Sequence, residues 1–150
     1  MTDFLGEYAS TLDAKGRFLL PAGFKKQLPD EDTGKFVINR GFDRCLTLYT
    51  VREWEPLFAK IKALNEFDPK QREFRRVFLS GATFVEPDSA GRILVPPTLK
   101  TYAELEKDIV ITSAGEKMEI WDSKKHKQLF DSFSSDAFSD LGRQVMGGDI

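Results

Sequence analysis

Two short motifs of the form Asp-x-x-Gly-Arg hold the residues whose types and spacing best suit a chemical role. The first contains Asp13, Lys15, Gly16 and Arg17. An aspartate accepts hydrogen bonds from nearby backbone amides and glycine permits a positive φ, so the motif predicts a tight turn. An arginine on a protruding turn can enter the major groove of DNA and donate two hydrogen bonds to one guanine, while Lys15 neutralises a phosphate. Equally, Arg17 can pair with Asp13 and brace the turn.

The second motif has the same turn-shaping residues, Asp88 and Gly91, followed by Arg92. It carries Ala90 at the position of the central lysine, so it is the weaker candidate for contact with DNA. We interpret Arg92 as a structural residue or as part of an interface. The predicted binding residues therefore lie mainly in the first motif.

Catalysis has little support in this sequence. The candidate catalytic pair is the single cysteine, Cys45, as nucleophile and the single histidine, His126, as general base. Cys45 lies in a strand pattern and fits a small core residue better. We expect His126 to be a partly exposed structural residue on a helix, and Ser89 has no partners for a triad. Phosphate-loop, dinucleotide and paired-histidine metal motifs are missing. We predict a protein that is not an enzyme and has no metal or cofactor.

Composition and net charge limit the kinds of protein that this chain can be. The chain has 150 residues, 41% of them hydrophobic, and a formal net charge of −2. Any binding to nucleic acid must then come from a local patch, and Lys25 and Lys26 add positive charge one short helix after the first motif. One cysteine excludes a disulfide, and the apolar runs are too short for a membrane span. The first residues do not resemble a signal peptide, so we expect a soluble cytoplasmic protein.

The chain repeats itself. Residues 6–28 realign with residues 81–103, and the two turn motifs, the apolar triplets after them, and Pro21 and Pro96 coincide. With small deletions the match continues, so that residues 36–38, 48–49 and 57–58 align with residues 109–111, 120–121 and 129–130. Two copies of one supersecondary unit are therefore fused in a single chain.

The sequence pattern of each copy predicts the same series of secondary-structure elements. An extended strand, the turn and a short apolar strand are followed by a short helix, a hairpin and a longer capped helix. The first copy carries an additional helix after Asp68, basic on one side and apolar on the other, which we do not expect in the second. Trp54, Leu57, Phe58, Phe74, Val77 and Phe78 supply core or subunit interface, and core is the expected use for most of them.

One such unit cannot cover both faces of its sheet, so two copies should pack around a pseudo-two-fold axis. This predicts an α+β protein, an antiparallel β-barrel or sandwich with peripheral helices. We divide it into a first domain over residues 1–80, including the linker helix, and a second over residues 81–133. Residues 134–150 are rich in Ser, Asp and Gly and predict a flexible tail.

Further motifs accompany the doubled turn: residues 52–55 (Arg-Glu-Trp-Glu), residues 73–76 (Glu-x-x-Arg) and residues 119–122 (Glu-Ile-Trp-Asp). Together they resemble the MraZ family, over residues 4 to about 133. The resemblance implies two tandem AbrB-like domains, which are swapped-hairpin β-barrels. It also implies a bacterial transcription regulator that forms a closed ring, associates with the nucleoid, and binds repeated sites upstream of the division and cell-wall operon that contains its gene. By position, it makes Lys15 and Arg17 the DNA-reading residues, with Lys25 and Lys26 as backbone contacts.

The expected partners are double-stranded DNA and further copies of this chain. One arginine turn makes few contacts, whereas a ring that presents the turn several times can engage successive repeats with avidity. The competing hypothesis is a non-catalytic protein-interaction or antitoxin-like β-barrel, in which both arginine turns are purely structural.

Overall fold

The computed structural model describes residues 3–148; the outermost ends of the first predicted domain and of the predicted tail, residues 1–2 and 149–150, lie outside it. The strands are β1 (Glu7–Thr11), β2 (Arg17–Leu19), β3 (Phe36–Arg40), β4 (Leu46–Thr50), β5 (Thr83–Val85), β6 (Arg92–Leu94), β7 (Asp108–Ser113) and β8 (Met118–Asp122). The helices are α1 (Ala22–Lys25), α2 (Val51–Lys62), α3 (Pro69–Gly81), α4 (Pro97–Tyr102), α5 (Ser123–Asp131) and α6 (Ser135–Met146). The short 3₁₀ turns η1 (Asp30–Asp32) and η2 (Phe42–Arg44) complete the order. The predicted strands and hairpins are confirmed.

The larger sheet interleaves the two copies. Its six strands follow the order β1-β7-β8-β4-β3-β5, with antiparallel pairing throughout. Strand β1 of the first copy pairs with β7 of the second, and β5 of the second copy pairs with β3 of the first. Exchanging the copies leaves this order unchanged, because β1, β3 and β4 correspond to β5, β7 and β8 in the repeat. Neither copy forms its half of the sheet without the other.

The smaller sheet lies on the same pseudo-two-fold axis. Strands β2 and β6 pair antiparallel with Phe18 opposite Ile93, and these two residues are equivalent in the repeat. Alternation along each strand turns Phe18 and Ile93 inward and places Arg17, Leu19, Arg92 and Leu94 on the outer face. The α+β class is confirmed, while the assignment to an AbrB-type swapped-hairpin barrel stays a prediction.

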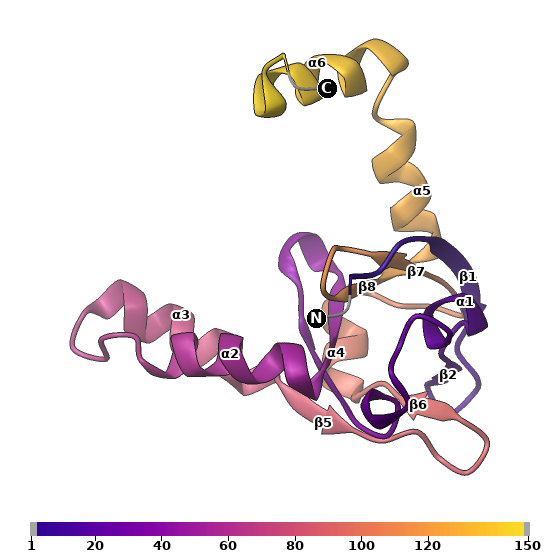
Figure 1. Ribbon diagram of the computed structural model, residues 1–150, viewed down its shortest axis with the longest axis vertical. Helices are drawn as coiled ribbons and strands as arrows, with labels where there is room; N and C mark the ends of the chain where they lie inside the picture. Colours follow the sequence, from indigo (N-terminus) through magenta and orange to yellow (C-terminus); the bar gives the residue numbers. More distant parts are fainter. Residues whose placement is uncertain (1–2, 149–150) are drawn as a thin grey trace.

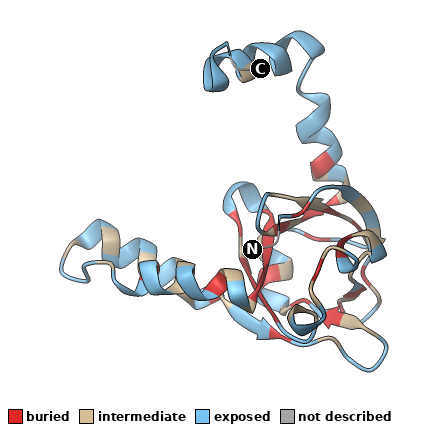
Figure 2. Ribbon diagram, viewed as in Figure 1, coloured by how far each residue is buried: buried red, intermediate tan, exposed pale blue. Residues whose placement is uncertain are grey.

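Both copies contribute to one hydrophobic core. Figure 2 shows the buried residues concentrated where the two sheets and the short helices α1 and α4 meet. The fully buried side chains of this cluster include Phe18, Phe24 and Phe36 from the first copy, with Ile93, Leu99 and Ile111 from the second. Because the cluster is shared, the apolar residues of each copy are covered by those of the other.

Helices α2 and α3 form a hairpin that projects from the sheet (Figure 1). Thr50 caps α2, as predicted, by accepting a hydrogen bond at Oγ1 from the backbone N–H of Glu53 at 3.2 Å. Trp54 is buried and stacks on Phe58 and Phe78, with ring centroids 5.9 Å apart in each pair. The predicted core role is correct for these three rings and for half-buried Leu57.

Two further apolar residues of the hairpin, Phe74 and Val77, are exposed, so the core role expected for most of the six apolar residues does not extend to them. Helix α3 begins after Asp68, whose side chain makes no capping hydrogen bond.

The second copy also has a counterpart of the additional helix. Helix α6 starts after Ser134, whose Oγ accepts a hydrogen bond from the Ala137 N–H at 3.0 Å. The expectation that the second copy lacks this helix is wrong, and the segment predicted as a flexible tail is helical over Ser135–Met146. In contrast to α3, α6 has no buried residue and stands away from the sheet (Figures 1 and 2). Its mobility stays a prediction.

Candidate nucleic-acid interface

The turn from residue 13 to residue 17 is built by the Asp13 carboxylate. Its Oδ1 accepts hydrogen bonds from the backbone N–H groups of Lys15 and Arg17, both at 2.9 Å. The backbone closes the turn with Gly16 N–H donating to the Asp13 carbonyl at 3.0 Å. Gly16 has a φ of +81°, a conformation that residues with a Cβ rarely adopt. The predicted turn is therefore held by its aspartate and its glycine.

The second turn repeats this geometry closely. Asp88 Oδ1 accepts from the N–H groups of Ala90 and Arg92, both at 2.9 Å, and Gly91 has a φ of +82°. Strands β2 and β6 then start at Arg17 and Arg92, whose side chains lie on the outer face of the small sheet. The two turns are equivalent in shape, and they differ in charge because only the first carries a lysine at its centre.

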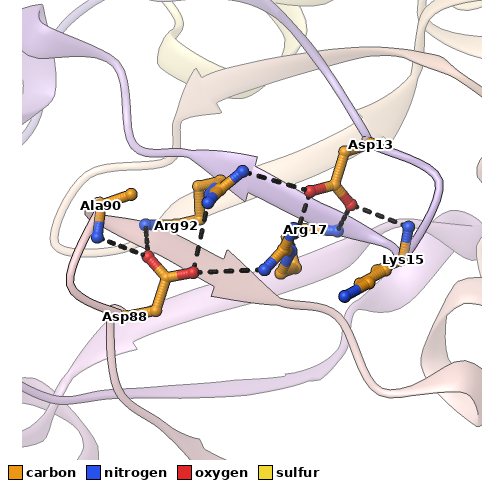
Figure 3. A network of polar contacts seen from close by, with 6 residues as sticks. All are labelled: Asp13, Lys15, Arg17, Asp88, Ala90 and Arg92. Carbon is orange, nitrogen blue, oxygen red and sulfur yellow. Dashed lines mark hydrogen bonds and ion pairs between the residues drawn. The ribbon is translucent and has the colours of Figure 1, made fainter.

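The four charged side chains form one cluster across the pseudo-two-fold axis. Figure 3 shows the two guanidinium groups between the two carboxylates. Arg17 Nε lies 2.8 Å from Asp13 Oδ2, and Arg17 Nη1 lies 3.5 Å from Asp88 Oδ2 of the other copy. The contacts of Arg92 are longer: 3.5 Å from Nε to Asp88 Oδ2 and 3.8 Å from Nη1 to Asp13 Oδ2. Arg17 therefore forms the ion pair with Asp13 that the structural alternative predicted. Its contacts are shorter than those of Arg92.

Both aspartates of the cluster have a pKa below the ordinary value for the residue. The hydrogen bond from the Arg17 backbone N–H is the largest cause of the lowered pKa of Asp13, and the Arg92 N–H has the same effect on the pKa of Asp88. Since the folded pKa lies below the unfolded value, the stabilisation is present above the ordinary aspartate pKa of about 3.9 and is lost as the pH falls through the folded pKa.

Asp13→Asn should therefore lower stability at neutral pH, because the amide keeps the shape of the turn and loses the charge that pairs with the arginines. Below the lowered folded pKa of Asp13, the parent carboxyl is also neutral, and the difference in stability should shrink toward zero. Urea midpoints measured for both proteins across this range test the sign. Glu116→Gln, at an exposed carboxylate in the β7–β8 turn, is the control. A difference that stays constant with pH would contradict this assignment.

Two exposed leucines share the outer face with the arginines. In the β2–β6 register Leu94 lies opposite Arg17, and Leu19 lies opposite Arg92. Both leucines are about half exposed. The sequence analysis did not select them, although the alternation around buried Phe18 and Ile93 was a sufficient signal.

The predicted basic residues do not all gather at the first turn. Lys15 is exposed at the tip of its turn, and its ammonium has no ion-pair partner among residues 3–148. Lys26 is exposed at the end of α1. Lys25 lines a cavity of about 390 Å³ together with residues 87–91, so it lies beside the second turn and not the first. The repeat alignment pairs Lys25 with Lys100, which the sequence analysis did not select and which pseudo-symmetry relates to the first turn.

Comparison with known proteins decides the family. A model of the family described as "MraZ protein, putative antitoxin-like" matches the chain twice, over residues 4–77 and 78–145. The chain belongs to the MraZ family. It is 42% identical over 143 residues to a protein of Cytophaga hutchinsonii, which covers 95% of this chain and 94% of the relative. It is 43% identical over 150 residues to one of Christiangramia forsetii (99% and 96%), and 39% identical over 145 residues to one of Kineococcus radiotolerans (97% and 98%). Each relative is named "Transcriptional regulator MraZ".

In this MraZ-family chain, the cysteine has an environment that disfavours catalysis. Burial raises the pKa of the Cys45 thiol to about 12, and its Sγ donates to the Phe42 carbonyl at 3.0 Å. A thiol with such a pKa stays protonated at neutral pH and is a poor nucleophile. The names of the relatives denote regulators and not enzymes.

His126 lies elsewhere, on α5, with Nε2 3.3 Å from Glu7 Oε1 and its ring 4.5 Å from that of Phe130. It is only 8% exposed, so the expected partial exposure is wrong. Among residues 3–148, no cluster of three or more potential metal ligands occurs, and no helix is long and apolar enough to cross a membrane.

Proposed function

We propose that this MraZ-family protein regulates transcription by binding double-stranded DNA through its first turn, with Arg17 reading a guanine and Lys15 contacting a phosphate. The observation that carries the proposal is the way in which Asp13 holds Arg17. The carboxylate takes Nε at 2.8 Å, which fixes the plane of the guanidinium. The two Nη groups are the pair that can donate to O6 and N7 of one guanine, once Nη1 gives up its longer contact with Asp88.

Attraction to phosphate must come from residues around the cluster. Two arginines and two aspartates cancel, so the cluster itself contributes no net charge. Lys15, exposed in the first turn, and Lys25, in the cavity beside the second turn, supply this positive charge. Lys26 at the end of α1 and Lys100 at the end of α4 are the further cations that we assign to phosphate contacts. Phosphate contacts fix the register of a protein on the duplex, and base contacts give the sequence preference.

The leucines complete the proposed reading surface. Leu19 and Leu94 flank the arginines on the same face, and an apolar side chain can contact the methyl group of thymine in the major groove. A guanine next to thymine positions is the kind of site that this face suits.

Binding to repeated sites follows from the small size of this surface. One turn gives few contacts, so we infer that the protein acts as a ring-shaped homo-oligomer whose subunits engage successive repeats. Because the chain belongs to the MraZ family, we expect its target to be the promoter of the division and cell-wall operon that contains its gene. A protein with this role works in the cytoplasm, associated with the nucleoid.

A second function has one observation in its favour. Arg17 and Arg92 are already paired with carboxylates in the absence of DNA. In this alternative the chain is a non-catalytic interaction or antitoxin-like module, and the cluster only joins the two copies. The alternative predicts no preference for any DNA sequence.

A titration by fluorescence anisotropy separates the two functions. DNA carrying the upstream region of the gene should bind more tightly than a shuffled duplex of equal length, and the affinity should fall steeply with added salt. Equal affinity for both duplexes at every salt concentration would reject sequence-specific regulation in favour of the alternative.

Lys15→Ala should weaken binding to both duplexes and reduce the slope of log K against log salt. The expected change is about 0.9 for each subunit engaged, because one phosphate contact is lost per turn. Lys60→Ala removes the same charge from an exposed position on α2 and should leave the slope unchanged. Equal slopes for the two variants would place Lys15 outside the interface.

A further inference from the structure

A cavity of about 440 Å³ lies between helix α5 and the face of the large sheet that is turned away from the shared core. The residues that give it its chemistry are Glu7, Thr112, Glu119, Trp121, His126 and Phe130. None of its lining residues belongs to either arginine turn, so the cavity is separate from the proposed DNA-reading face. Its volume is in the range of cavities that hold small organic molecules.

Two carboxylates stand in one row across three neighbouring strands. Glu7 lies opposite Thr112 in the β1–β7 pair, and Thr112 lies opposite Glu119 in the β7–β8 pair. Paired residues of antiparallel strands point to the same face of the sheet, so both carboxylates are on the side of the cavity. Two interstrand spacings, about 10 Å in total, separate the strands that carry them.

These two carboxylates have no basic side chain to balance them. Among residues 3–148, neither Glu7 nor Glu119 forms an ion pair with a lysine or an arginine. Glu119 Oε1 accepts a hydrogen bond from Trp121 Nε1 at 3.1 Å, which holds the carboxylate beside the indole ring. A cavity with two uncompensated negative charges repels anions and concentrates cations.

A buried imidazole nitrogen lacks a hydrogen bond at the same place. His126 is 8% exposed, and its Nε2 has no hydrogen-bond partner among residues 3–148, although Glu7 Oε1 lies 3.3 Å away. A buried polar atom in this condition costs free energy until a partner reaches it. In the neutral imidazole, an unprotonated Nε2 accepts a hydrogen bond, and an ammonium group offers three N–H donors.

The same place in the first copy is filled by protein. Trp54 packs there in an apolar cluster with Tyr49, and Phe78 of helix α3 stacks on it. Among the described residues of the second copy, no helix takes the place of α3. Residues 3–6 precede β1 without forming a helix, and α6 stands away from the sheet (Figure 1). The cavity therefore corresponds to the space that α3 fills in the other half of the molecule.

The residue types around this space also differ between the copies. Three positions that are neutral in the first copy carry ionisable groups in the second: Ala82 corresponds to Glu7, Thr47 to Glu119, and Trp54 to His126. The aromatic wall is kept, because Trp121 corresponds to Tyr49. Negative charge beside aromatic rings is the combination that binds organic cations.

We propose that this cavity binds a linear aliphatic diamine. One ammonium group donates hydrogen bonds to the Glu7 carboxylate and to His126 Nε2, and the other pairs with Glu119. The methylene chain lies against the rings of Trp121 and Phe130. The separation of about 10 Å between the outer strands suits a chain of about four methylene groups with a charge-assisted hydrogen bond at each end.

Isothermal titration calorimetry of the full chain with 1,4-diaminobutane, without DNA, tests the proposal. The parent should bind the diamine saturably, with one molecule per subunit. n-Butylamine has the same methylene chain and one ammonium group, so it should bind about tenfold more weakly, because one charge-assisted contact is lost. No binding of the diamine, or equal affinities for the two amines, would overturn the proposal.

Two substitutions that remove charge locate the site. Glu7→Gln and Glu119→Gln keep the length of the side chain and one oxygen acceptor, and each should weaken diamine binding by about tenfold. Glu116→Gln is the matched control, because Glu116 is an exposed carboxylate of the β7–β8 turn that does not line the cavity. It should bind the diamine as the parent does. Parent-like affinity in either cavity variant, or an equal loss in the control, would place the diamine elsewhere and contradict the assignment.

Discussion

Arg17→Ala should abolish sequence-specific DNA binding and leave the fold and the assembly intact. The substitution removes two hydrogen bonds to guanine from every engaged subunit, and each such pair is worth about 1–3 kcal/mol of discrimination. An assembly that binds several repeats loses this amount several times, so the variant should bind the target no better than a shuffled duplex. Anisotropy on both duplexes measures the effect.

Stability should change little in the same variant. Arg17 is 26% exposed in its ion pairs, and pairs at the surface contribute about 0–1 kcal/mol. Asp13 keeps its hydrogen bonds from the backbone and its contact with Arg92. Circular dichroism and light scattering should therefore match the parent.

Arg92→Ala is the matched control, because it removes the same side chain from the equivalent position of the turn that lacks a lysine. It should cost less affinity than Arg17→Ala. Parent-like affinity of Arg17→Ala would exclude Arg17 as the reader, and equal losses in the two variants would mean that both turns read DNA.

The turns were predictable from the sequence because their chemistry is local. Asp13 and Gly16 act within five residues, and the same holds for Asp88 and Gly91. The cluster that joins the turns was not predictable in this way. Its contact between Arg17 and Asp88 depends on the pairing of β2 with β6, which brings together residues far apart in the chain. The repeat indicated a pseudo-two-fold axis. It did not indicate that β2 and β6 are the strands that pair across this axis.

Helix α6 was not predicted, because the composition of residues 134–150 concealed its helical spacing of apolar residues. Serine, aspartate and glycine suggested a tail, yet Phe138, Leu141 and Val145 have helical spacing and Ser134 is a good cap. The placement of Lys25 beside the second turn is a consequence of the interleaved strands, since elements of one copy pack against the turn of the other. Sequence patterns predicted the elements well, and the exchange of partners between copies decided where the basic residues lie.

Phe18→Ala should lower the free energy of unfolding by about 3–5 kcal/mol, a large share of the 5–15 kcal/mol that stabilises a typical domain. Phe18 is 1% exposed and faces Ile93 on the pseudo-two-fold axis, so the cavity opens in the core that both copies share. For the same reason the variant should still unfold in a single transition, because neither copy keeps a core when the other is lost.

Leu19→Ala is the control for the core position. Leu19 is the next residue of the same strand, is 55% exposed on the outer face, and should change stability by no more than about 0.5 kcal/mol. Urea unfolding followed by fluorescence and by circular dichroism gives both free energies and tests whether the transitions coincide. Two separate transitions in the parent or in Phe18→Ala would contradict a shared core. Equal losses in the two variants would contradict the inward orientation of Phe18.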